Sequence, residues 1–170
     1  ALGSACKLIR ANGGFRAEAT DPILIGQIQV VNLPDMEKAK QALRDRKQEI
    51  INLANSFHPN MVARGGGARD IELFVHPMPT SAKTMLVVHL LVDTRDAMGA
   101  NLVNGMCEGV APLVESITGG EVFLRILSNL TDRSLAPAYS KIPGRHVPHH
   151  TDEQVTKPPS ALEFFAQREG

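Results

Sequence analysis

The sequence predicts an α+β fold of the ferredoxin-like βαββαβ type, with a four-stranded antiparallel sheet and two helices on one face. Four apolar segments have the length and the β-branched composition of strands. Two longer segments carry apolar residues at helical spacing, one after the first strand and one after the third. Because crossover connections are right-handed, both helices should pack on the same face of the sheet.

The first strand is expected at residues 23–33, "ILIGQIQVVNL", which are rich in Ile, Val and Leu and precede Pro34. From Asp35 to Phe57, apolar residues recur at steps of three and four or their multiples. This spacing predicts one long amphipathic helix. We interpret its charged side as a solvated face rather than a binding surface.

A loop is expected after this helix, because Pro59 and the glycine run at residues 65–67 are unfavourable inside a helix. Residues 71–75 then alternate between apolar and other side chains, and Pro77 closes the segment. A second apolar run covers residues 84–92. The pattern predicts two strands that are joined as a hairpin.

The second helix is expected over residues 99–118, where apolar side chains form one stripe. Pro112 should kink or divide this helix, since proline removes one backbone hydrogen bond. Two glycines at 119 and 120 end it. Residues 121–130, "EVFLRILSNL", then form the last predicted strand.

Composition excludes several classes of partner. The 18 basic and 18 acidic residues cancel, so no net field favours nucleic acid or an anionic membrane. The longest apolar stretches, at residues 85–92 and 110–114, are far shorter than the roughly 18 to 20 residues that span a bilayer. Cys6 and Cys107 lack a pairing pattern and are expected to be reduced, buried structural thiols. These features favour a cytoplasmic protein.

Histidines offer little evidence of chemistry. His76 and His89 fall on predicted strands, where a structural role is more common than catalysis. The cluster of His146, His149 and His150 lies in a proline-rich end without matching cysteines or carboxylates, so no metal site is predicted. No Ser-His-Asp or Cys-His arrangement is recognised.

The segment "DTRDAMGAN", residues 93–101, joins a predicted strand to a predicted helix. The first amides of a helix lack internal partners, and Gly99 would let a phosphate approach the backbone, so an anion site is one interpretation. In the alternative, Asp96 caps the helix and Gly99 only makes the turn. One glycine is weaker evidence than a GxGxxG motif, so spacing alone leaves both interpretations open.

Five motifs that follow one another along the chain favour the anion site over the capped helix. The sequence resembles the bacterial-type, second class of 3-hydroxy-3-methylglutaryl-coenzyme A reductases over residues 6–142. The motifs are "RANGGF" at 10–15, "GGGARDIE" at 65–72, "DAMGAN" at 96–101 followed by "LVN", "APLVESITGG" at 111–120 and "LRILSNL" at 124–130.

The resemblance implies a domain organisation and a set of site residues. Residues 21–131 would be the NAD(P)-binding small domain, residues 1–20 a remnant of the large substrate domain, and residues 132–170 a return segment or a non-native tail. The coenzyme, NADPH or NADH, would place its pyrophosphate at the predicted helix start. Asn129 would contact the substrate or the nicotinamide. The residues implied for coenzyme binding are Asp96, Met98, Gly99, Ala100, Asn101, Asn104 and His58.

The resemblance also implies an activity, the interconversion of 3-hydroxy-3-methylglutaryl-CoA with mevalonate and CoA by two hydride transfers. The family's catalytic glutamate should precede Ala1, and its lysine, aspartate and histidine should follow the small domain. No catalytic residue is therefore assigned to this chain, which alone is expected to be inactive. A homodimer or higher homo-oligomer is implied. The alternative is a non-catalytic nucleotide-binding or interaction module of the same fold.

Coenzyme choice is set in the family partly by an acidic residue at the end of the first long helix, which favours NADH. Here His58 occupies that region, with Ser56 and Arg64 nearby. These side chains suit a 2′-phosphate, so NADPH should be accepted at least as well as NADH. Alternatively, they face solvent and another loop decides the preference.

Overall fold

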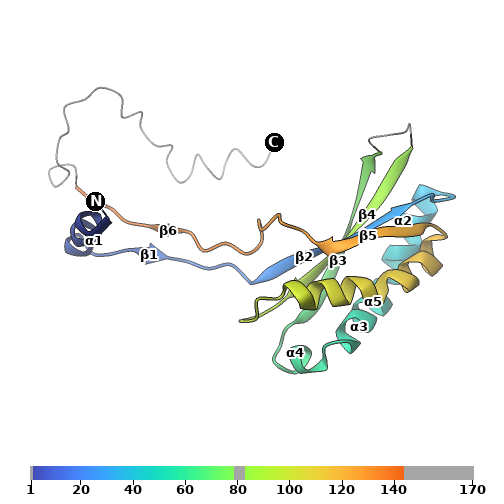
Figure 1. Ribbon diagram of the computed structural model, residues 1–170, viewed down its shortest axis with the longest axis horizontal. Coiled ribbons are helices and arrows are strands. Elements are labelled where there is room, and N and C mark those ends of the chain that lie inside the picture. The colour runs from blue at the N-terminus through green and yellow to red at the C-terminus, as the bar shows by residue number, and fades with distance from the viewer. Residues whose placement is uncertain (1, 79–82, 144–170) are drawn as a thin grey trace. The chain divides into compact units, whose positions relative to one another are not determined.

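The structure, a computed structural model, describes residues 2–78 and 83–143 (Figure 1). The chain divides into two compact units, one of residues 17–138 and one that contains the remaining residues at both ends. The smaller unit contains helix α1 (Leu2–Ala11), which ends where the Asn12 side chain donates to the Leu8 carbonyl at 2.8 Å. Two short strands, β1 (Arg16–Ala17) and β6 (Ala138–Tyr139), pair with each other.

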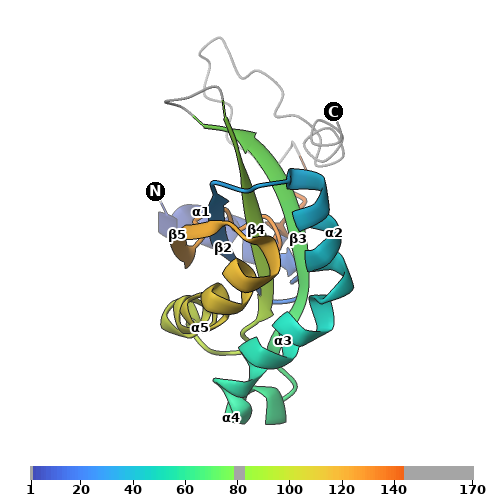
Figure 2. The ribbon, with the colours of Figure 1, turned by 90° about the vertical axis from the view of Figure 1, so that its right-hand side faces the viewer.

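The larger unit contains one four-stranded antiparallel sheet with strand order β3-β4-β2-β5. Its strands are β2 (Ile23–Val31), β3 (Gly67–Pro77), β4 (Thr84–Asp93) and β5 (Glu121–Leu127). Helices α2 (Met36–Asp45), α3 (Lys47–Ser56) and α5 (Ala100–Thr118) cover one face of the sheet (Figure 2). The predicted α+β fold is confirmed, including the antiparallel sheet and the helices on one face.

The core lies between the helices and the sheet. Alternate residues of β4 point toward the helices, and all four are fully buried: Leu86, Val88, Leu90 and Val92. Burial of each such side chain contributes about 1.5–3 kcal/mol, so this layer fixes the strand register. The helices supply the facing layer with Leu43, Ile50, Val103, Val110 and Val114.

The predicted long helix is two helices, α2 and α3, that meet at Arg46. Arg46 has backbone angles of φ −102° and ψ 18°, and its guanidinium Nε donates to Glu49 at 2.7 Å. The break lets α2 bury Leu43 and α3 bury Ile50 against a twisted sheet. No glycine or proline marks the break, so apolar spacing alone did not predict it.

Pro112 was expected to kink or divide the second helix, and the structure contradicts the division, because α5 continues through this residue. Pro112 is exposed, whereas its neighbours Val110, Ala111 and Val114 are buried. Their packing offsets the one hydrogen bond that proline removes. The helix ends at Gly119, whose left-handed φ of 67° forms the C-cap.

The predicted loop after Phe57 contains a short helix, α4 (Pro59–Ala63), which proline begins at its first position. The glycine run follows, and β3 begins within it at Gly67 rather than at Ile71. The early part of β3 contains a bulge between Ala68 and Asp70. This bulge interrupts the alternation that located the strand in the sequence.

Other expectations are partly met. Cys107 is buried and its burial raises the pKa of the thiol to about 12, but Cys6 is exposed, so its predicted burial is wrong. None of the α1 residues is buried, which explains the exposure of Cys6. Within the described ranges no helix is long and apolar enough to cross a membrane, and no cluster of potential metal ligands occurs. His146, His149 and His150 lie outside the described residues.

Candidate functional site

The candidate site is the turn between β4 and α5. The chain leaves β4 at Asp93 and enters α5 through Gly99, which is the N-cap residue and has a left-handed φ of 77°. A side-chain Cβ at this position would lie 2.6 Å from the Thr94 Cγ2 and 2.8 Å from the Leu24 Cδ1. Glycine is therefore required by the packing of the turn itself, before any ligand is considered.

The first turn of α5 has unusual electrostatics for this fold. No side chain caps it and no acidic residue occupies it, whereas α2 and α3 carry Glu37 and Glu49 in their first turns. The Ala100 N–H donates to the Met98 carbonyl at 3.0 Å. Among the described residues, the backbone N–H groups of Asn101 and Leu102 have no acceptor. Two donors and the positive end of a 19-residue helix are thus available to an anion.

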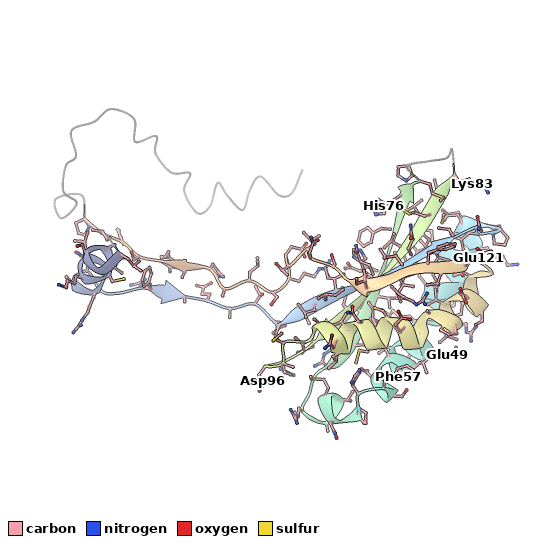
Figure 3. The ribbon with its side chains drawn as sticks, in the orientation of Figure 1. Glu49, Phe57, His76, Lys83, Asp96 and Glu121 are labelled. Carbon is pink, nitrogen blue, oxygen red and sulfur yellow. The ribbon has the colours of Figure 1, made fainter. Side chains whose placement is uncertain are left out.

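Asp96 does not act as the cap of α5. Its side chain is exposed at the tip of the turn and makes no hydrogen bond to any part of the chain that the structure describes (Figure 3). Met98 is 95% exposed and Asn101 is also exposed. The structure therefore contradicts the alternative in which Asp96 satisfies the first helix amides.

A buried carboxylate lies under this turn and was not assigned a role from the sequence. Asp93 is only 6% exposed. Its Oδ1 accepts the Arg95 backbone N–H at 3.0 Å, and its Oδ2 accepts the Arg69 Nη2 at 3.1 Å. The guanidinium groups of Arg69 and Arg95 both donate to the carbonyl of Gly65, with the Arg95 Nε at 2.8 Å. This network joins the α5 turn to the glycine run.

Glycines in that run permit close packing that larger residues would prevent. A Cβ on Gly66 would lie 2.8 Å from the Asp93 carbonyl oxygen, and one on Gly67 would lie 2.4 Å from the Asn55 Oδ1. The Asn55 side chain accepts the Ala68 N–H at 2.7 Å and donates to the Ala68 carbonyl at 3.2 Å. The end of α3 is thereby fixed to the start of β3.

His58 lies near the start of α5, although about forty residues separate it from Gly99 in the sequence. A Cβ on Gly105 would be 3.5 Å from the His58 Nε2, and a Cβ on Gly109 would overlap the Phe57 ring. These two helix glycines let the α3–α4 connection pack against α5. Their spacing of four residues was the signal in the sequence that could have predicted this contact.

A hollow of about 260 Å³ opens beside His58. It is lined by Phe57, His58, Pro59, Asn60, Met61, Arg64 and Leu102. Leu102 belongs to the first turn of α5, so the hollow borders that turn. The structure therefore brings His58 and the first turn of α5 together.

The two asparagines assigned by resemblance lie on the same end of the sheet as the turn. The Asn104 Oδ1 accepts the Leu127 backbone N–H at 2.7 Å, which links α5 to the end of β5. Asn129 is exposed just beyond that end, where the Ser128 N–H donates to the Ile25 carbonyl at 2.7 Å. Since Ile23 at the start of β2 pairs with Asp93 at the end of β4, the β4–α5 turn and the end of β5 lie at the same end of the sheet.

Of the two strand histidines, His89 fits a structural role. His89 is half-buried, and its Nε2 lies 3.2 Å from the Gln27 amide nitrogen. Burial lowers the pKa of His89, partly opposed by the charge of Glu72. The Phe74 ring packs on His89 at a centroid distance of 4.6 Å. This cluster lies on the sheet face opposite the helices, because its members pair with residues that alternate with the core layer.

Comparison with known proteins identifies the family. The sequence profile described as hydroxymethylglutaryl-coenzyme A reductase matches residues 1–164. This chain belongs to the hydroxymethylglutaryl-coenzyme A reductase family. A 3-hydroxy-3-methylglutaryl-coenzyme A reductase of Archaeoglobus fulgidus is 49% identical over 138 residues, which cover 81% of this chain and 31% of the relative. A probable reductase of Borreliella burgdorferi is 31% identical over 86% of this chain and 32% of its own length.

Solved structures agree with the sequence comparisons. A class II reductase from Streptococcus pneumoniae, described as bound to NADPH in open conformations, matches with a TM-score of 0.78 and 36% identity. The match covers 84% of this chain and 34% of that protein. The chain thus spans about a third of the length of its relatives. The family and the class that the five motifs predicted are confirmed.

Proposed function

We propose that this chain is the coenzyme-binding part of an NAD(P)H-dependent reductase that interconverts 3-hydroxy-3-methylglutaryl-CoA with mevalonate and CoA. The start of α5 carries this proposal, because two backbone N–H groups are available there without a capping side chain or an acidic residue. A similar protein of known structure is described as bound to NADPH, which supports a dinucleotide as the ligand.

The coenzyme pyrophosphate would bind at the N–H groups of Asn101 and Leu102. The fit is chemically sound, since an uncapped helix start supplies both hydrogen-bond donors and a favourable potential for a diphosphate. Gly99 shapes the turn, Ala100 begins the helix, and Asp96 and Met98 are exposed beside it. When bound, the coenzyme supplies the hydride, and the role of these residues is to hold and orient it.

Asn104 and Asn129 are proposed to act at the reacting end. Asn104 holds the end of β5 through the Leu127 amide, and Asn129 follows this anchored segment as an exposed side chain. An exposed carboxamide can donate to a thioester carbonyl or orient the nicotinamide amide. We therefore assign coenzyme binding to Asn104 and substrate contact to Asn129.

The hollow beside His58 is proposed to accept the adenosine 2′-phosphate. His58 and Arg64 line it, and both side chains can donate to phosphate oxygens. Among the described residues, no aspartate or glutamate lines this hollow, so its described lining carries no negative charge that would repel a second phosphate. The prediction that NADPH serves at least as well as NADH follows from this composition.

Further proposals concern the complete protein. We propose residues 21–131 as the NAD(P)-binding small domain, residues 1–20 as a remnant of the large substrate domain, and residues 132–170 as a return segment toward that domain or a non-native tail. Because no catalytic residue is assigned to this chain, we propose that the chain alone has no reductase activity. We further propose a homodimer or higher homo-oligomer and a cytoplasmic location, as the family resemblance implies.

The proposal is tested with the complete protein and NADPH. Addition of 3-hydroxy-3-methylglutaryl-CoA should oxidise two NADPH molecules for each mevalonate formed, followed at 340 nm and by product analysis. NADPH binding without turnover would instead favour the non-catalytic nucleotide-binding module. Absence of both binding and turnover would contradict the proposed coenzyme site.

A further inference from the structure

We propose that Asp93 is a positioning residue for the coenzyme, because its buried carboxylate fixes the backbone turn that presents the α5 amides. This inference rests on the proposed coenzyme site at the start of α5. The Asp93 carboxylate makes its hydrogen bonds to Arg95 and Arg69 and not to the two available amides. It acts through Arg95 on one side and through the glycine run on the other.

The first part of the argument is the backbone of Arg95. Its φ is +52°, a left-handed conformation that costs a non-glycine residue about 1–2 kcal/mol. The Asp93 Oδ1 accepts the Arg95 N–H at 3.0 Å, an Asx-type turn that compensates this cost. Because the carboxylate is nearly buried and also paired with Arg69, it is a preorganised acceptor for this N–H, and the left-handed turn depends on Asp93.

The second part is the ionic connection. The Asp93 Oδ2 lies 3.1 Å from the Arg69 Nη2, and its Oδ1 lies 3.6 Å from the Arg95 Nε. Both guanidiniums also donate to the Gly65 carbonyl. One carboxylate therefore holds two cations against a single carbonyl, and this clamp joins the α5 turn to the loop that leads to β3.

The turn transmits this constraint directly to Gly99. Between them, the Ala97 N–H donates to the Thr94 carbonyl at 3.0 Å, and the Thr94 N–H donates to the Pro22 carbonyl at 3.1 Å. Gly99 packs on Thr94 so closely that an added Cβ would lie 2.6 Å from the Thr94 Cγ2. A change in the left-handed backbone conformation of residue 95 would therefore displace Gly99 and the N–H groups that follow it.

The test is a double-mutant cycle in the complete protein, read by NADPH fluorescence titration. D93A should raise the Kd for NADPH about tenfold, as expected for loss of a charge-assisted hydrogen bond. R95G removes one guanidinium of the clamp but makes the left-handed conformation inexpensive, so it should raise the Kd less than D93A does. In the R95G background, D93A should then cost less than about threefold, a rescue that a purely structural role for Asp93 does not produce.

Asp70 supplies the matched control. It lies on the neighbouring strand, and its carboxylate forms an ion pair with Lys47 at 2.9 Å that does not involve the α5 turn. D70A should leave the NADPH Kd unchanged. In steady-state assays, D93A should raise the KM for NADPH and leave kcat within about twofold. If D93A does not fold, D93N keeps the volume and one acceptor and should give an intermediate loss of affinity.

Two results would overturn the inference while leaving the coenzyme site in place. One is wild-type NADPH affinity in folded D93A, or in D93N if D93A does not fold. The other is an equal loss of NADPH affinity on the D93A substitution whether residue 95 is Arg or Gly. That result would show that Asp93 does not act through the turn. Failure of the wild-type protein to bind NADPH would be a different result, since it contradicts the proposed function itself.

Discussion

Replacement of Asn101 by Asp should stabilise the fold and weaken coenzyme binding, two effects of opposite sign from one charge. Asn101 is exposed in the first turn of α5, its side chain makes no hydrogen bond to the described residues, and it differs from Asp by one charged group. A carboxylate at a helix start contributes about 0.3–1 kcal/mol of stability. N101D should therefore unfold at the same or a slightly higher temperature.

The same carboxylate should repel the pyrophosphate. Two like charges at about 5 Å in water cost about 0.8 kcal/mol, so the two charges of a diphosphate cost about 1.6 kcal/mol. This energy corresponds to about a fifteenfold rise in the Kd for NADPH. At 1 M salt the screening length falls to about 3 Å, and most of the difference should disappear.

The assay is NADPH fluorescence titration of the complete protein at low and high salt, together with thermal unfolding. N52D is the matched control, because Asn52 is an exposed residue of α3 with the same change of charge. The Kd of N52D for NADPH should stay within about twofold of the wild-type value. Equal affinity of N101D and wild type at low salt would refute the placement of the pyrophosphate at the start of α5.

Three further predictions test separate parts of the structure. G99A should reduce the free energy of unfolding by about 2–4 kcal/mol, measured by urea denaturation, because it combines a left-handed φ with overpacking on Thr94; wild-type stability would contradict the turn geometry. Iodoacetamide at pH 8 should modify the exposed Cys6 in the folded protein and Cys107 only after unfolding, since burial raises the pKa of Cys107 to about 12; mass spectrometry that finds Cys107 modified first would disprove this. H58D should shift the ratio of kcat/KM values from NADPH toward NADH; an unchanged ratio would show that another loop decides coenzyme choice.

Apolar patterning was sufficient to predict the sheet and its covering helices. Each of the four strand segments either alternates between apolar and polar residues or is apolar throughout. In β4, the fully buried core residues occupy every second position of the strand. Irregular features were missed where they have no compositional signal. The helix break at Arg46 contains no glycine or proline. The continuous path of α5 through Pro112 depends on tertiary packing, which the residues around the proline do not reveal.

The candidate site was predicted in part. Gly99 and the helix start were found from the change of a strand pattern into a helix pattern, and the approach of His58 came only from family resemblance. The Asp93 network was missed because its partners, Arg69 and the Gly65 carbonyl, are distant in sequence. A buried aspartate at the end of an apolar strand, two residues before an arginine, is a usable signal for such a turn.

The most direct test of the account is a crystal structure of the complete protein with NADPH. We expect pyrophosphate oxygens within hydrogen-bond distance of the Asn101 and Leu102 N–H groups, and the 2′-phosphate in the hollow beside His58. A pyrophosphate bound elsewhere, with the first turn of α5 exposed to solvent, would contradict the central claim.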